Sequence, residues 1–136
     1  MYSSSSAAAQ YQRINTESAI ENATPHQLIQ MLMSGALDRM IQAKATMERG
    51  DIALKGELIG KAISIIAGLQ ASLDPKHSTE LVDNLGALYD YMQRKLFEAN
   101  VKNDPALIDE VYGLMRTVKS SWDEIGPETQ AQQSGQ

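Results

Sequence analysis

The sequence predicts an all-α protein: an up-and-down antiparallel four-helix bundle that follows a flexible or partly helical N-terminal arm. Apolar residues recur at alternating steps of three and four, which is the spacing of one face of a helix. Four segments of about twenty residues have this spacing, and short connections with capping residues, Gly or Pro separate them. No segment shows the strict apolar–polar alternation that is typical of a half-buried strand.

The first helix is predicted to begin after Thr24 and to end near Gly50. Thr24 and Gln27 form a Thr-x-x-Gln capping box, and Pro25 fits the first helical position. Gly50 suits a left-handed C-terminal cap, and Asp51 suits the N-cap of the next helix. The expected buried seam is Ile29, Met33, Ala36, Met40, Ala43 and Met47. A second apolar set lies off this seam: Leu28, Met31, Leu32, Leu37 and Ile41.

The second helix is predicted from Ile52 to Leu73. Its expected seam is Ile52, Ile59, Ala62, Ile66, Leu69 and Leu73, widened by Leu58, Ile63 and Ile65. Three glycines, Gly56, Gly60 and Gly68, each weaken a helix by about 1 kcal/mol relative to Ala. Glycines at this spacing would let another helix approach closely. The simplest interpretation is that this helix belongs to the same bundle.

The third helix is predicted from Glu80 to Ala99, capped by Ser78 or Thr79, and the fourth from Pro105 to Ile125. The third seam is Leu81, Leu85, Leu88, Met92 and Ala99, beside a second surface of Val82, Tyr89, Tyr91, Leu96 and Phe97. The fourth seam is Ile108, Val111, Met115, Val118, Trp122 and Ile125. Gly126-Pro127 is expected to stop this helix. One domain is therefore expected over residues 11–125, with disorder over residues 1–10 and 126–136.

Composition excludes several classes of protein. The 136 residues carry a formal net charge of −5 and no cysteine, which excludes disulfides and thiol catalysis. Lys and Arg form no basic stripe, so nucleic acid is not an expected partner. No apolar run is long enough for a membrane span, and the Ser/Ala-rich start does not look like a secretory signal. A cytoplasmic location is the resulting expectation.

The pattern of ionisable residues predicts no catalytic, metal or cofactor site. His26 and His77 are the only histidines, and neither forms the Glu-x-x-His pair of a di-metal bundle. Both are expected to be surface residues at helix ends, which argues against a histidine phosphotransfer bundle. No Gly-rich phosphate loop and no Ser/His/Asp set is present. The protein is therefore not expected to be an enzyme.

The excess of apolar residues on the helix flanks suggests two hypotheses. One is a groove that accepts an amphipathic partner segment and that Tyr11 and Ile14 cover when the partner is absent. The other is a dimeric bundle that serves as an adaptor or structural protein through the same flanks. A monomer or a weak homodimer is compatible with the pattern, as is a fully buried core with shielded flanks.

Several motifs together resemble the FliS family of flagellar export chaperones. They begin with Tyr11, Ile14 and the string Thr24-Pro-His-Gln-Leu-Ile-Gln-Met-Leu-Met-Ser-Gly-Ala-Leu37. Further matches are Lys61-Ala62 before Ile65-Ile66, Leu73-Asp74, Asn84-Leu85 before Leu88-Tyr89-x-Tyr91-Met92, Ala99-Asn100, Asn103-Asp104, and Glu110-Val111 leading to Trp122. Two positions depart from the family pattern. Met33-Ser34 stands where the family usually has Tyr-Asp, and His77-Ser78-Thr79 replaces its usual Gly pair.

The resemblance implies a cytoplasmic chaperone that binds the disordered C-terminal segment of flagellin and prevents premature polymerisation before type III export. Other flagellar export or regulatory proteins are further partners that the family suggests. The client segment would fold on binding, and the N-terminal arm would mask part of its site. The residues expected to contact the client are Tyr11, Ile14, Leu58, Ile65, Tyr89, Met92 and Leu96.

Overall fold

Four long helices form the protein, as the sequence predicts. The computed structural model describes residues 20–74, 76 and 79–134, of which residues 127–134 are described by their backbone only. The helices are α2 (Pro25–Arg49), α3 (Ile52–Ala71), α4 (Glu80–Lys102) and α5 (Pro105–Ser134). Tyr11, Ile14 and His77 lie outside the described residues, as does the predicted disorder of residues 1–10.

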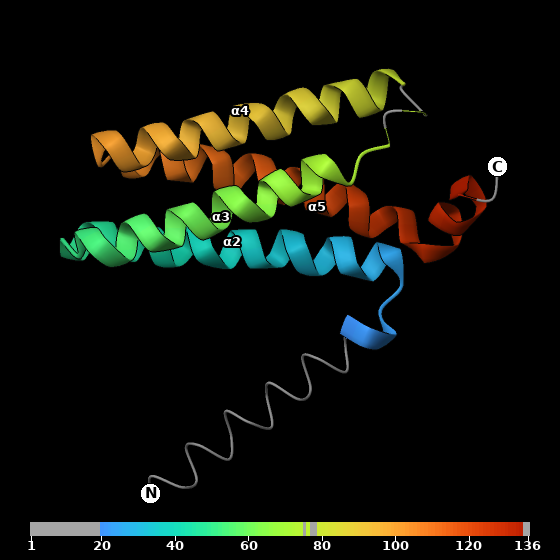
Figure 1. The fold of residues 1–136 in the computed structure, drawn as a ribbon, viewed down its shortest axis with the longest axis horizontal. Coiled ribbons are helices and arrows are strands. Elements are labelled where there is room, and N and C mark those ends of the chain that lie inside the picture. Colours follow the sequence, from blue (N-terminus) through green and yellow to red (C-terminus); the bar gives the residue numbers. More distant parts are fainter. Residues whose placement is uncertain (1–19, 75, 77–78, 135–136) are drawn as a thin grey trace, which may run out of the picture.

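The helices run up and down in a closed ring (Figure 1). α2 packs against α3 and α5, and α4 also packs against α3 and α5, so each helix has two principal neighbours. Short turns make consecutive helices antiparallel, and contact between α2 and α5 closes the ring. This arrangement confirms the predicted fold class. None of the described helices combines the length and the apolar character needed to cross a bilayer.

The helix ends confirm the predicted capping chemistry. The Gln27 backbone N–H donates to Thr24 Oγ1 (3.1 Å), and the Thr24 N–H donates to Gln27 Oε1 (2.9 Å). Gly50 has φ 77°, the left-handed conformation that glycine adopts without steric cost. Asp51 and Thr79 then cap α3 and α4 through their side-chain oxygens. Local sequence therefore sets where these helices begin and end.

Most of the predicted seam residues lie in the core. The buried apolar side chains are Met33, Ala36, Met40, Ala43, Met47, Leu58, Ile59, Ala62, Ile66, Leu69, Tyr89, Met92, Leu96, Ala99, Ile108, Val111 and Met115. Three seam predictions are wrong: Ile52, Leu81 and Ile125 are exposed. Ile52 and Leu81 lie in the first turns of α3 and α4, and Ile125 precedes the kink in α5. At such ends no further turn of a neighbouring helix covers the seam.

α5 kinks at Gly126, where the backbone leaves the helical region (φ 78°, ψ 161°). The helix thus breaks where Gly126-Pro127 predicts a stop. The backbone becomes helical again and continues to Ser134, whereas the sequence predicts a disordered tail over residues 126–136. Pro is well suited to the first turn of a new helix, and the Glu, Gln and Ala that follow are good helix formers.

Candidate partner-binding groove

A stripe of α2 residues borders α3 and stays partly open to solvent. Leu28, Leu32, Gly35 and Arg39 follow one another at steps of four, three and four, which places them on one side of the helix. A Cβ atom built on Gly35 would lie 3.5 Å from Ile65 Cδ1, so this side faces α3. Leu28 and Leu32 are each 37% exposed although both are large and apolar.

The stripe leads into a hollow of about 580 Å³ between α2 and the outer surface of α3. Its lining is Arg39, Glu57, Gly60, Lys61, Ser64 and Ile65. Gly60 is open, since a Cβ there would meet nothing within 4 Å. We call the residues of the stripe and the hollow the α2–α3 groove: Leu28, Leu32, Gly35, Arg39, Glu57, Gly60, Lys61, Ser64 and Ile65. It combines apolar side chains with a surface that a helix could approach closely.

The charges of the hollow are unequally paired. Lys61 Nζ lies 3.2 Å from Glu57 Oε1, an exposed pair between successive turns of α3. Arg39 is half-buried and has no ion-pair partner among the residues that the structure describes. The six lining residues therefore carry two positive charges and one negative charge on a protein whose net charge is −5.

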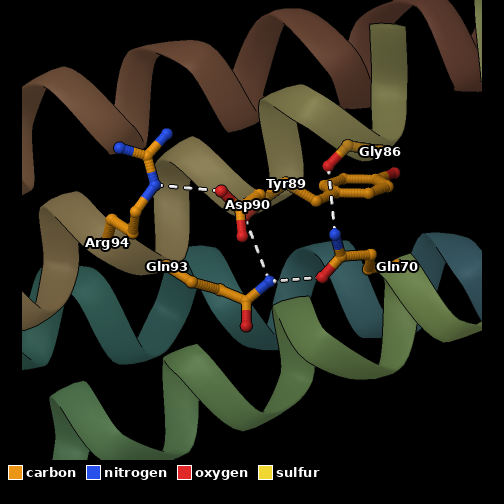
Figure 2. A network of polar contacts seen from close by, with 6 residues as sticks. All are labelled: Gln70, Gly86, Tyr89, Asp90, Gln93 and Arg94. Atoms are coloured by element: carbon orange, nitrogen blue, oxygen red, sulfur yellow. Dashed lines mark hydrogen bonds and ion pairs between the residues drawn. The ribbon is translucent and has the colours of Figure 1, made fainter. Parts of the chain in front are cut away.

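The opposite flank of α3 is tied to α4 by a polar network (Figure 2). Gln70 Nε2 donates to the Gly86 carbonyl oxygen (3.1 Å), and Gln93 Nε2 donates to Gln70 Oε1 (2.9 Å). Gln93 also donates to the Tyr89 carbonyl oxygen (3.1 Å) within α4. Because these amides are only partly exposed, they fix the register of the two helices.

The residues predicted to contact a client fall into three groups. Leu58, Tyr89, Met92 and Leu96 belong to the core and are at most 6% exposed. Burial raises the pKa of the Tyr89 hydroxyl to about 12. Ile65 is half-buried and lines the hollow, whereas Tyr11 and Ile14 lie outside the described residues. The apolar flanks of α3 and α4 therefore fill the bundle more completely than their pattern suggests.

Sequence reasoning missed Arg39, although a signal was available. Leu28 and Leu32 belong to the predicted off-seam set, and Arg39 continues the same side of α2 at helical spacing.

The structure also places the two residues at which the sequence departs from the family pattern, Met33 and Ser34. Met33 is buried in the core, and Ser34 is half-buried but does not line the hollow.

α2 is closed on its other side by a reciprocal contact with α5. The His26 and Trp122 rings stack with centroids 4.9 Å apart and an angle of 12° between planes. Trp122 Nε1–H donates to the His26 carbonyl oxygen (3.0 Å), and His26 Nε2 lies 2.7 Å from the Trp122 carbonyl oxygen. A carbonyl can only accept, so Nε2 carries the proton. We call this pair the His26–Trp122 clasp.

The clasp overturns the expectation that His26 is a surface residue, because His26 is 2% exposed. The physical reason is a partner distant in the sequence: the Trp122 carbonyl lies one turn before the kink of α5 at Gly126 and accepts from the imidazole. The imidazole thus ties the first turn of α2 to the turn of α5 that precedes the kink. Its buried Nδ1 has no hydrogen-bond partner among the described residues.

Two further contacts bridge α2 and α5. Gln30 Nε2 donates to Asp123 Oδ1 (2.7 Å), and Lys44 Nζ lies 2.9 Å from Asp109 Oδ1. Hydrogen bonds from Lys119 and Gln30 hold the pKa of Asp123 below its usual value. Polar groups therefore link these helices from the His26 end to the far end of the bundle.

A second exposed apolar site lies on α4. Phe97 and Val101 are 63% and 69% exposed and are one helical turn apart. Phe97 is the only phenylalanine of the chain. Two large exposed side chains at this spacing extend the apolar surface of the bundle beyond the α2–α3 groove.

Comparison with known proteins agrees with this architecture. A family model described as "Flagellar protein FliS" matches residues 7–129. The chain is 52% identical to the flagellar secretion chaperone FliSB of Pseudomonas aeruginosa over 116 residues, which are 85% of this chain and 92% of the relative. It is 44% identical to the flagellar secretion chaperone FliS of Salmonella typhimurium over 135 residues, which are 98% and 99% of the two chains.

A solved structure titled as a flagellar chaperone from bacteria has the same fold, with a TM-score of 0.69. The match covers 85% of this chain and 94% of that chain at 16% sequence identity. From the family match over most of its length and from relatives of such high identity, the chain belongs to the FliS family of flagellar proteins, whose curated relatives are flagellar secretion chaperones.

Proposed function

We propose that the protein is a cytoplasmic export chaperone that holds the C-terminal segment of flagellin in the α2–α3 groove, without catalysis. The observation that supports this proposal best is the line of partly exposed Leu28 and Leu32 leading into the hollow beside Ile65. An amphipathic helix laid along this groove would cover apolar side chains that otherwise face water. The names of the curated relatives give the flagellar context.

The client would become ordered as it binds. A disordered segment loses conformational entropy on folding, and burial of apolar surface has to offset that loss. A long, shallow surface suits this mode better than a deep pocket, because an extended client can contact it over several turns. Phe97 and Val101 on α4 are a second site for the same client chain to contact.

The N-terminal arm would compete with the client. Tyr11 and Ile14 carry apolar side chains, and they precede α2, the helix that contributes Leu28 and Leu32 to the groove. A cover of this kind lowers the apparent affinity for a client by the free energy needed to displace it. It also shields the apolar groove from other copies of the protein.

Calorimetric titration with a synthetic peptide of the flagellin C-terminal segment from the same organism tests the proposal. One-to-one binding with a large negative heat-capacity change is expected, because the peptide folds while apolar surface is buried. Absence of binding at tens of micromolar would contradict the proposal.

Ile65→Asp is expected to raise the Kd of this peptide at least tenfold, since it places a charge among the apolar contacts of the groove. Ile41→Asp is the matched control, because Ile41 is an exposed isoleucine on the α2–α5 side. Circular dichroism should show that both variants keep their helical content. Equal affinity of the two variants would place the client elsewhere on the bundle.

A further inference from the structure

Arg39 differs from Glu57 and Lys61, the other two charged residues that line the hollow, because those two pair with each other. It is half-buried, it continues the line of Leu28 and Leu32, and no described carboxylate pairs with it. The other cation that lines the hollow, Lys61, already contacts a carboxylate, that of Glu57. A half-buried cation without a counter-charge is suited to receive one from a partner.

We infer that Arg39 recognises a carboxylate on the helix that occupies the α2–α3 groove. The partner is therefore an amphipathic helix that presents an Asp or Glu one or two turns away from its apolar contacts with Leu28 and Leu32. This inference rests on the proposed function and specifies the chemistry of the client at the same site.

Charge complementarity supports this partner. The hollow carries two positive charges and one negative charge, whereas the whole chain carries a net charge of −5. The protein as a whole therefore repels acidic peptides, whereas this hollow attracts them. The difference favours one position and one register of the bound peptide, and it also contributes to affinity. The guanidinium offers two parallel donors to a carboxylate, a geometry that an ammonium group does not offer.

The hollow has space for this contact. A Cβ on Gly60 would meet nothing within 4 Å, and Ser64 is exposed one turn further along α3. A client backbone can therefore approach α3 beside Arg39, which shortens the reach between the guanidinium and an acidic side chain of the client.

The test compares Arg39→Gln with Arg116→Gln in calorimetric titrations with the flagellin C-terminal peptide. Arg116 is a matched control, because it is an exposed arginine of α5 with no ion-pair partner among the described residues. We expect Arg39→Gln to raise the Kd about five- to tenfold and Arg116→Gln to change it less than twofold. Arg39→Lys should restore part of the affinity.

Substitution of each Asp and Glu of the peptide by its amide identifies the contact. We expect one of these amide peptides to bind the natural protein as weakly as the unmodified peptide binds Arg39→Gln. The affinity of that amide peptide should not fall further when Arg39→Gln replaces the natural protein. Equal Kd values for Arg39→Gln and Arg116→Gln would overturn the inference and leave the proposed function standing. No binding of the peptide to the natural protein would overturn the proposed function itself. If Arg39→Gln changed only the self-association of the protein, measured by sedimentation, the hollow would bind a second copy of this chain. That result would also overturn the inference.

Discussion

The two sides of α2 differ in how they meet their neighbours. On the α5 side, the His26–Trp122 clasp, Gln30–Asp123 and Lys44–Asp109 bridge the helices with polar groups. On the α3 side, Leu28, Leu32 and Arg39 remain partly exposed along the α2–α3 groove. α2 packs closely against both neighbours, but polar bridges mark its α5 side and partly exposed apolar side chains mark its α3 side. A groove on the α3 side would let a client bind without opening the core.

The largest expected effect comes from removing the clasp. Trp122→Ala should lower the free energy of unfolding by about 3 kcal/mol, because the half-buried ring, its stacking on His26 and one hydrogen bond are lost together. Urea unfolding followed by circular dichroism measures the change.

Trp122→Phe separates the ring from its hydrogen bond. It keeps an aromatic ring for stacking, lacks the N–H donor, and should lower the free energy of unfolding by about 1 kcal/mol. A loss below about 0.5 kcal/mol for Trp122→Ala would mean that the His26–Trp122 clasp does not stabilise the contact between α2 and α5.

A smaller effect of opposite sign is expected in the groove. Gly60→Ala should raise the free energy of unfolding by about 0.5–1 kcal/mol, because the new methyl group meets open space and the helix gains propensity. Gly50→Ala is the matched control and should destabilise, since Gly50 has φ 77°. If both substitutions destabilised, Gly60 would have a packing role inside the bundle.

The smallest expected effect is a change in pH dependence. The lowered pKa of Asp123 means that its carboxylate stabilises the fold above the pKa of the unfolded chain. This contribution is lost as pH falls below about 4 and through the folded-state value. Thermal unfolding of Asp123→Asn should therefore vary less with pH in the acid range than that of the natural protein.

Local signals explain why the fold could be predicted from the sequence. Thr24, Gly50, Asp51 and Thr79 set helix ends through contacts with residues a few positions away. Short connections then leave antiparallel packing as the simple solution for four amphipathic helices. Exposure of Ile52 and Leu81 could not be predicted in this way, because the pattern of one helix does not say where its neighbours end.

The clasp and the exposure of the predicted contact residues were less predictable, since both depend on contacts between distant residues. His26 and Trp122 are 96 positions apart, and no local pattern pairs a first-turn histidine with a carbonyl of the last helix. Tyr89 and Leu96 were expected to lie on an apolar flank and to contact a client, yet both are buried in the core. Ile65 is the predicted contact that the structure places at the described surface, because Gly35 lets α2 pass close to it without covering it.

The clasp also gives the protein an optical reporter of its own. Trp122 is the only tryptophan of the chain, and its indole stacks on His26 and donates to the backbone of α2. The emission of an indole changes when such neighbours are lost, so the intrinsic fluorescence reports whether this end of α2 and α5 is closed. The groove lies on the other side of α2. A client that binds there leaves the emission constant, whereas a client that separates α2 from α5 changes it.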